Sequence, residues 1–289
     1  MKKLVLLFFI ALTSLNAKAQ PFVFDSKNST SSVSLSCAFV SLADDPSAVF
    51  INPAGLVQLD KYELYTDSND GVHSHVDRSA RVAGTIKLKQ LVLAGGFYYG
   101  FDKKYNQSRT SLAIAYTFLK GTVGSFLSGG LSFDYMTASG EGVSTVGNGG
   151  DSDRIFTVSI GTVIRPLPVV SLALSILNLP DINPRRVNAN YWKRCMLWGV
   201  SYFWREKVTI LYEQEIIERE VTHHYGFVLK TASPIELMSG FSNGRIAGGV
   251  RWRGSFFNIS CAFISNKSDP VTYSVSVEMM RKAKGKDAF

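Results

Sequence analysis

Histidines and carboxylates are the side chains of this chain with the clearest potential for chemistry. His73 and His75 are two residues apart, so a strand would point both imidazole rings to one face. Three carboxylates lie close to them in the sequence: Asp67, Asp70 and Asp77. Imidazole and carboxylate groups at this spacing can hold a cation, but the stretch has the composition of a solvated polar loop. We therefore predict no metal site and no cofactor.

Nucleophilic catalysis has no clear set of residues here. A hydrolase needs a serine beside a histidine that an acid or amide orients, and the chain contains no G-x-S-x-G turn. His223 and His224 are adjacent, so a regular strand points them to opposite faces. Glu213 and Glu215 begin a charged stretch that we interpret as a solvated hairpin tip. The glycine-rich residues 147–150 lack the lysine of a phosphate loop. We predict that the protein is not an enzyme.

Arginines are the residues that could hold a ligand carboxylate. Four of them fall on suitable positions of the predicted strands: Arg78, Arg81, Arg154 and Arg251. They form no obvious cluster in the sequence, and we interpret them as interfacial or loop residues.

The elements that must position these residues follow a regular rhythm. From Tyr62 to Met280, strand-like stretches of about ten residues recur. The predicted long polar connections are residues 67–76, 101–109, 138–153, 179–193 and 265–270. The predicted short turns lie at residues 89–90, 120–125, 165–168, 205–207 and 253–254. Long loops on one side and short turns on the other indicate an antiparallel barrel that stands in a membrane.

Within the stretches, bulky and small residues alternate strictly. In residues 111–119, Leu112, Ile114, Tyr116 and Phe118 share one face, and serine, alanine and threonine occupy the other. A period of two predicts strand rather than helix. The bulky face should meet lipid, with tyrosine and tryptophan as interfacial anchors, and the small face should point inward.

The count of these units predicts the fold class. We expect an all-β transmembrane antiparallel β-barrel of about 14 strands at residues 61–280, with the weakest strand pattern at residues 235–241. The longest apolar stretch, residues 167–179, is too short and too interrupted for a membrane-spanning helix. A barrel of this width needs something inside its lumen, or it would leak.

The two ends of the chain carry basic residues. Lys2 and Lys3 precede an apolar stretch at residues 4–12, and Ala17-Lys18-Ala19 fits a cleavage site, so residues 1–19 are predicted to be a signal peptide. Residues 281–289 form a basic C-terminal tail. A secreted barrel of this kind is expected in the bacterial cell outer membrane.

Composition and charge indicate the partners. Hydrophobic residues make up 46% of the chain and charged residues 19%, which is apolar for a secreted soluble protein. The net charge of +8 falls to +5 when the three leader lysines are removed. The remaining excess is spread over loops and the tail, so we predict contact with anionic outer-membrane lipid and no nucleic-acid binding.

Residues 20–60 precede the strand rhythm and are the predicted hatch. Residues 32–40 are interpreted as a short strand or an extended insert. Asp44 or Asp45 before Pro46 reads as a helix N-cap with proline at the first helical position. The Asn52-Pro53 pair should then break the helix, because the residue before proline avoids helical angles.

This stretch also carries a family resemblance. Residues 43–56, ADDPSAVFINPAGL, resemble the N-terminal signature of the FadL-type outer-membrane transporter superfamily. That superfamily includes long-chain fatty acid and aromatic hydrocarbon channels and the PorV/PorQ-like proteins of type IX secretion. The resemblance implies a fourteen-stranded barrel closed by an N-terminal hatch. It also implies that the hatch tip gates a path for ligand, at residues Asn52, Pro53 and Ala54, with Gly55 freeing the next turn.

Two functions fit these expectations. The first is passive uptake of hydrophobic small molecules, which a kinked strand at Gly95-Gly96 or Gly248-Gly249 would assist by opening the wall. The alternative is a PorV/PorQ-like component of a type IX secretion system that binds exported proteins or the translocon. Extracellular loops shorter than those of typical fatty acid transporters, and the absence of a clear clamp for a ligand carboxylate, favour the alternative, whereas a continuous apolar tunnel past Asn52–Ala54 would favour uptake.

Overall fold

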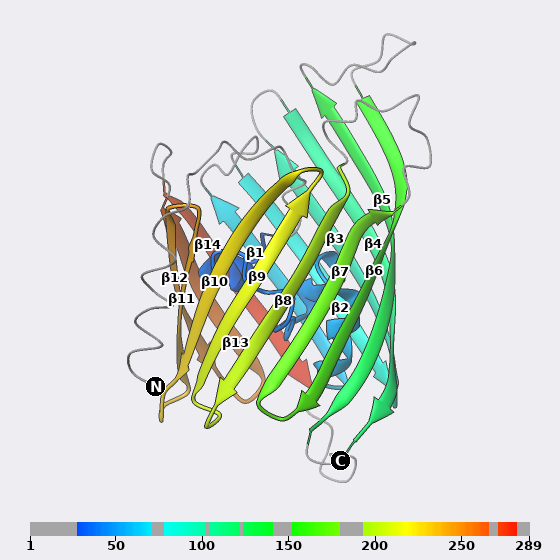
Figure 1. Ribbon diagram of the computed structural model, residues 1–289. Helices are drawn as coiled ribbons and strands as arrows, with labels where there is room; N and C mark the ends of the chain where they lie inside the picture. The colour runs from blue at the N-terminus through cyan, green and yellow to red at the C-terminus, as the bar shows by residue number, and fades with distance from the viewer. Residues whose placement is uncertain are drawn as a thin grey trace.

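The computed structural model describes residues 28–70, 78–101, 105–121, 124–140, 152–179, 193–265 and 271–281. These residues form fourteen strands that close into one antiparallel barrel in which each strand pairs with its sequence neighbours and β1 pairs with β14 (Figure 1). The strands are β1 Tyr62–Asp70, β2 Arg78–Leu88, β3 Leu91–Phe101, β4 Tyr105–Lys120, β5 Phe126–Gly140, β6 Ser152–Leu167, β7 Val170–Leu179, β8 Cys195–Trp204, β9 Val208–Ile217, β10 Glu220–Lys230, β11 Ile235–Ser242, β12 Arg245–Arg253, β13 Phe257–Ser265 and β14 Thr272–Arg281. The predicted barrel and its strand number are confirmed, and the weakest predicted strand is β11.

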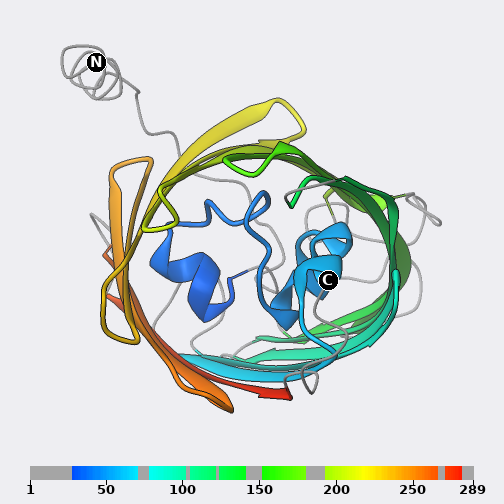
Figure 2. The same ribbon diagram turned by 90° about the horizontal axis from the view of Figure 1, so that it is seen from below.

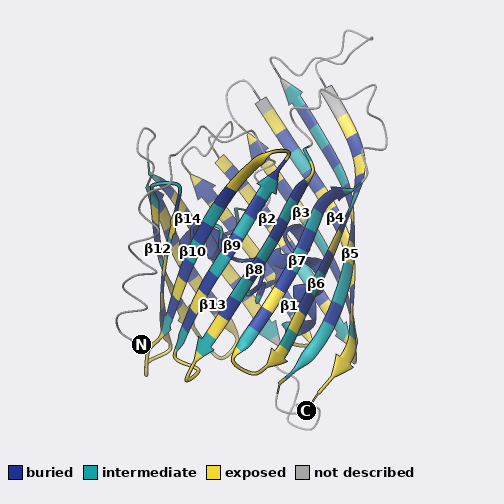
Figure 3. Ribbon diagram, in the orientation of Figure 1, coloured by how far each residue is buried: buried dark blue, intermediate teal, exposed yellow. Residues whose placement is uncertain are grey.

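The period-two pattern explains the two surfaces of the wall. Leu112, Ile114 and Phe118 of β4 point outward and are exposed, while Ala113 and Ala115 between them are buried. The same alternation runs along the other strands (Figure 3). The outer surface is therefore a continuous apolar band, which is the surface that a barrel presents to lipid. No helix among the described residues is long and apolar enough to cross a membrane.

The predicted separation of long loops at one end of the barrel from short turns at the other is less strict than expected. At one end, here called the turn end, the chain turns within residues 89–90, 168–169 and 205–207. At the other, here called the loop end, β9 and β10 are joined by only two residues, 218–219.

Several predicted loop residues belong to strands instead. Asp67 lies inside β1, and residues 105–109 lie inside β4. β4, β5 and β6 reach 16, 15 and 16 residues, because their polar ends continue the pairing beyond the apolar band.

Residues 28–59, here called the lumenal segment, lie inside the barrel (Figure 2). They contain α2 Thr30–Ser34 and two 3-10 helices, η3 Pro46–Phe50 and η4 Pro53–Gln58. The predicted cap before Pro46 is confirmed, with Asp45 as the capping residue of η3. Asn52, predicted only to break a helix, follows the end of η3 and also caps η4. The predicted strand or extended insert at residues 32–40 is wrong at its start. Ser29 caps α2 there, and Ser34 Oγ donates to the Ser31 carbonyl, so the serines stabilise a helical turn. The predicted signal peptide and residues 282–289 of the predicted basic tail lie outside the described residues, whereas Arg281 is the last residue of β14.

Candidate functional site

The tip of the lumenal segment is the turn between η3 and η4. Asn52 is fully buried there, and its Oδ1 accepts the Ala54 amide hydrogen at 3.1 Å. Its Nδ2 donates to the Val40 carbonyl at 3.0 Å, which ties the tip to the preceding loop. One amide therefore fixes both the start of η4 and the path of the chain before η3.

Two wall glycines receive this tip. A Cβ built on Gly161 of β6 would lie 2.1 Å from Asn52 Oδ1, and one built on Gly130 of β5 would lie 2.5 Å from the Pro53 carbonyl carbon. Real Cβ atoms do not approach other atoms so closely, so only glycine lets the tip reach the wall at these two places. Gly55 is packed in the same way, with a built Cβ 2.3 Å from that of Ala43. The structure thus brings all four predicted site residues, Asn52 to Gly55, to the inner face of β5 and β6.

Few polar contacts hold the tip to the wall. Ser128 Oγ of β5 donates to the Ala54 carbonyl at 3.0 Å, and Ser175 Oγ of β7 donates to the Ile51 carbonyl at 2.7 Å. Each neutral hydrogen bond contributes about 1 kcal/mol. Arg109 Nη1 of β4 also donates to the Phe50 carbonyl at 3.2 Å, and Asn52 Nδ2 donates to the Thr162 carbonyl at 3.5 Å. The tip is therefore held by its shape and by a small number of hydrogen bonds.

The wall beside the tip is irregular. The register between β6 and β7 shifts near Val158 and again near Ile164. Asn178, in the first shift, has the left-handed φ of 61°, which is typical of a bulged strand residue.

The predicted wall opening at Gly95-Gly96 or Gly248-Gly249 is not where the irregularity lies, because these glycines pair in unbroken register. Gly96 and Gly249 instead make room for the lumenal segment: built Cβ atoms would meet Phe50 Cζ at 2.6 Å and Ser34 Cβ at 2.6 Å.

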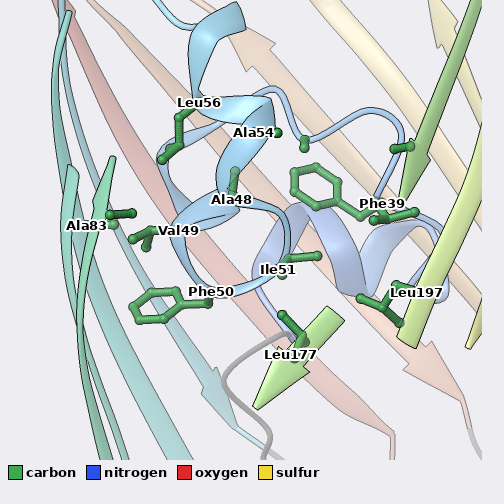
Figure 4. Close-up of a cluster of buried hydrophobic side chains, with 14 of the residues drawn as sticks. Phe39, Ala48, Val49, Phe50, Ile51, Ala54, Leu56, Ala83, Leu177 and Leu197 are labelled. Atoms are coloured by element: carbon green, nitrogen blue, oxygen red, sulfur yellow. The ribbon is translucent and has the colours of Figure 1, made fainter. Parts of the chain in front are cut away.

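One side of the lumenal segment is apolar. Phe39, Val49, Phe50, Ile51 and Leu56 are buried against small or apolar wall residues (Figure 4). The wall residues of this cluster come mainly from β2 to β9 and include Ala83, Val92, Ala113, Met136, Ile155, Val163, Leu177 and Leu197. Such an interface is non-directional and lets two surfaces separate without leaving unpaired hydrogen-bonding groups.

The other side of the segment is polar. Glu213 Oε2 of β9 accepts the backbone amides of Phe39 at 2.8 Å and Val40 at 2.7 Å. Arg251 Nη2 of β12 donates to Ser31 Oγ at 2.6 Å, and Ser31 donates in turn to Asp45 at 2.5 Å. The predicted solvated tip at residues 213–215 is therefore wrong. Glu213 and Glu215 share the inner face of β9 with Leu211 and Ile217, and this period of two was the signal available in the sequence.

The lumen also contains compensated charges. Arg81 pairs with Asp67 at 2.8 Å, and Arg109 pairs with Asp134 at 3.0 Å, with all four side chains buried. Sequence reasoning named Arg81 and missed Arg109, whose partner lies on the next strand.

The predicted arginine candidates separate into two groups. Arg81 and Arg251 are buried among carboxylates, whereas Arg78 and Arg154 are exposed. The buried pairs are thus already neutralised and do not form a preformed clamp for a ligand carboxylate.

The histidines that fall in the described residues do not act together. His223 faces outward against Tyr212, and His224 faces inward, 3.1 Å from Glu215 and 2.7 Å from the Ser36 carbonyl. His73 and His75 lie outside the described residues. Within the described part of the chain, no group of three or more His, Cys, Asp or Glu side chains could hold a metal ion.

Comparison with known proteins places the fold. No family model and no curated protein matches the sequence. Among solved structures, the monoaromatic hydrocarbon channel CymD matches at a TM-score of 0.64 and 9% identity, over 89% of this chain and 98% of that one. The toluene transporter TodX of Pseudomonas putida matches at 0.61 and 9% identity, over 90% and 99%. A FadL homologue of Pseudomonas aeruginosa matches at 0.57 and 8% identity, over 92% and 99%. The resemblance predicted from residues 43–56 is confirmed at the level of the fold: this chain has the fold of the FadL-type outer-membrane transporters.

Proposed function

We propose that this protein is a bacterial outer-membrane channel for the passive uptake of hydrophobic small molecules. In this proposal the lumenal segment is a movable hatch, and Asn52, Pro53, Ala54 and Gly55 are its gating tip. The protein does not act as an enzyme. Its partners are outer-membrane lipid, on the apolar outer band, and the transported solute.

The packing of the tip against the wall is the main support for this proposal. Asn52 and Pro53 fill the space left by Gly161 and Gly130, next to the only wall pair with two register shifts among the described strands. A plug that is held by its shape and a few hydrogen bonds, beside a weakened strand pair, can leave its seat at a modest cost. The displaced tip would open a path along β5 to β7, either through the wall or toward the turn end.

The apolar side of the lumen supports the choice of solute. Met136, Ile155 and Leu177 lie toward the loop end and belong to the same apolar cluster as Phe50 and Ile51 of the segment. An apolar solute that entered from the loop end would meet a matching surface, while a charged solute would meet the compensated pairs of Arg81 and Arg109. The named activities of the structural neighbours, which are transporters of toluene and monoaromatic hydrocarbons, agree with this class.

The secretion-partner alternative gains no support of this kind. None of the structural neighbours described above is named as a secretion component, and no feature of the described residues favours it.

An engineered disulfide that fixes the lumenal segment to the wall, here called the lock, tests the proposal because it can be reduced again. Ser41 Oγ of the segment lies 2.6 Å from Ser201 Oγ of β8, so Ser41→Cys with Ser201→Cys should form a disulfide with little distortion. The matched control is Ser108→Cys with Thr137→Cys, whose oxygens lie 2.8 Å apart on the paired strands β4 and β5. Both pairs are built in a chain whose native cysteines, Cys37, Cys195 and Cys261, are replaced by serine.

Uptake of radiolabelled toluene and oleate is then followed in Gram-negative cells that lack their own hydrophobic-compound channel. We expect oxidation of the Ser41→Cys/Ser201→Cys variant to lower uptake at least about tenfold, because the disulfide prevents the segment from moving. Reductant should restore uptake. The control pair should leave uptake unchanged in both states. Equal uptake by the oxidised and reduced lock would disprove the hatch, and uptake no faster than in cells without the protein would disprove transport.

A further inference from the structure

Residues 35–37 of the lumenal segment, here called the corner, follow α2 and pack closely against the wall. Ser36 and Cys37 both have left-handed φ angles, of 51° and 72°, which residues other than glycine seldom adopt. A Cβ built on Gly240 of β11 would lie 2.2 Å from the Leu35 carbonyl carbon and 2.5 Å from the Ser36 nitrogen. A backbone of this kind persists where neighbouring contacts hold it.

One histidine of the wall binds this corner. His224 of β10 points into the lumen and is 4% exposed, and its Nδ1 lies 2.7 Å from the Ser36 carbonyl oxygen. Its Nε2 lies 3.1 Å from Oε2 of Glu215 on β9, which is also buried. A single imidazole ring therefore joins the lumenal segment to a carboxyl group of the wall.

The two contacts of His224 together require a proton. A carbonyl oxygen only accepts hydrogen bonds, so Nδ1 must carry a hydrogen and donate it to Ser36. In a neutral imidazole, Nε2 would then be an acceptor that faces a carboxylate, which is also only an acceptor. The contact is favourable if Nε2 is protonated too, or if Glu215 is a carboxylic acid that donates to Nε2. In either form the pair holds one proton more than a neutral histidine and an ionised glutamate.

Polar and titratable side chains lie around the pair on each neighbouring element. They come from β9, β8, β11, β12 and the lumenal segment, in that order: Glu213, Cys195, Ser242, Arg245 and Cys37. Glu213 lies directly opposite His224 in the register, whereas Arg245 lies two strands away in the same row. Cys195 Sγ donates to Glu215 Oε1 at 3.5 Å. The nearer charges are thus those of carboxylates, which favour a proton on the pair.

We propose that His224 and Glu215 form a proton-operated latch that holds the corner against the wall. This inference rests on the proposed function, in which the lumenal segment is a movable hatch, and it adds the regulation of that hatch. While the pair keeps its proton, His224 donates to the Ser36 carbonyl and the corner stays in place. When the proton leaves, Nε2 and the carboxylate face each other as two acceptors, and the ring loses the position from which it binds Ser36.

The direction of the pH dependence follows from this proton. Docking of the corner takes up a proton, because the two contacts of His224 require one that a neutral histidine and an ionised glutamate lack. An equilibrium that takes up a proton is favoured at low pH and is weakened as the pH rises. Histidine ordinarily changes its charge between about pH 5 and 8. A rising pH outside the cell therefore releases the hatch.

Thiol labelling of Cys37 tests the latch, because this residue adjoins the latched carbonyl and is only partly exposed. The detergent-solubilised protein is treated with iodoacetamide at about pH 5 and about pH 9, which enclose the range of histidine. Peptide mass spectrometry separates Cys37 from Cys195 and Cys261. Labelling rates are compared between variants at the same pH, which cancels the intrinsic pH dependence of the thiol.

The variants separate the proton from the rest of the contact. Glu215→Gln supplies an amide hydrogen to Nε2 without an added proton, so Cys37 should react slowly at both pH values. The wild type should match this variant at the lower pH and react at least about tenfold faster than it at the higher pH. His224→Phe, which removes both contacts, should react fast at both. His223→Gln, on the outer face beside His224, is the matched control and should follow the wild type.

The latch is overturned if the wild type and Glu215→Gln react at the same rate at the higher pH, or if His223→Gln abolishes the pH dependence. Nitrogen NMR of histidine-labelled protein is a second check. A wild-type His224 without a hydrogen on Nδ1 at the lower pH would also overturn the latch, since the Ser36 carbonyl would lack its donor. Labelling needs no solute, so a working latch in a protein that transports nothing would overturn the proposed function and leave the latch in place.

Discussion

The side-chain amide of Asn52 occupies the space that a side chain on Gly161 would need. A Cβ at position 161 would lie 2.1 Å from Asn52 Oδ1 and 3.1 Å from Pro53 Cδ. The same Oδ1 caps η4. The fold of the tip and its seat on β6 therefore depend on one atom, and a change on either side should disturb both.

Gly161→Ala should unseat the tip. The added methyl group overlaps Asn52, and overpacking of this kind costs about 1 to 3 kcal/mol. We expect the outer membrane of cells that produce the variant to admit hydrophobic antibiotics more readily, measured as a lower inhibitory concentration. Gly84→Ala is the control, since its nearest atom to the new Cβ is 3.7 Å away. Equal inhibitory concentrations for the two variants would contradict a seated tip.

Glu213 should be the main polar anchor of the segment. Glu213→Ala leaves the amides of Phe39 and Val40 without the acceptor at 2.8 and 2.7 Å, a loss of about 1 to 3 kcal/mol for each amide. Hydrogen exchange of those two amides in the detergent-solubilised protein should accelerate by at least about tenfold. Gln214→Ala, on the outer face of the same strand, should leave both amides protected. Unchanged exchange in Glu213→Ala would mean that packing alone holds this loop.

Local sequence rules predicted the outer surface of the wall better than they predicted the contacts inside the lumen. The outward positions of β4 could be recognised because lipid accepts only bulky apolar groups, and the cap before Pro46 could be recognised because proline follows it. Asn52 was predicted to end a helix, and its capping of η4 was missed. The inward positions follow no such rule. Glu213 looked like part of a charged tip, because its meaning depends on which part of the lumenal segment lies opposite it.

Pairs that depend on register were equally hidden. Arg109 and Asp134 are 25 residues apart and meet only because β4 and β5 pair in one specific register. The bulge at Asn178 is marked by no glycine, so a search for a wall opening at glycine pairs led to Gly95 and Gly248. The seat at Gly161 could not be predicted either, since the sequence does not say which wall glycine faces the tip.

The buried pair of Arg109 and Asp134 should behave as a unit. Arg109→Met leaves Asp134 with the hydroxyl groups of three serines, and an uncompensated buried charge costs about 3 to 5 kcal/mol. Arg109→Met combined with Asp134→Leu should regain most of that loss. The temperature at which the folded band disappears in heated gel samples measures it. Arg78→Met removes an exposed pair with Asp70 and should change this temperature little. A double variant as unstable as Arg109→Met would show that the pair does not act as a unit.

Asp45 should make the docking of the lumenal segment depend on pH. Burial, together with repulsion by Glu278 and Asp44, raises the pKa of Asp45 to about 7 against the pull of Arg251. The folded protein thus holds this proton more tightly than the unfolded chain does, whose value is 3.8. Protonated Asp45 therefore stabilises the folded protein. This stability is fully present near pH 4 and is lost as the pH rises toward 7.

Asp45→Asn isolates this effect, because asparagine also caps helices but does not titrate. Relative to this variant, the wild type should lose stability between pH 5 and pH 8 by an amount on the order of 1 to 3 kcal/mol. Heat unfolding of both proteins at the two pH values measures the difference. Asp70→Asn, at the exposed loop end, should follow the wild-type profile. Parallel profiles for the wild type and Asp45→Asn would mean that Arg251 keeps Asp45 ionised throughout, and that the segment is docked by an ion pair instead of a protonated cap.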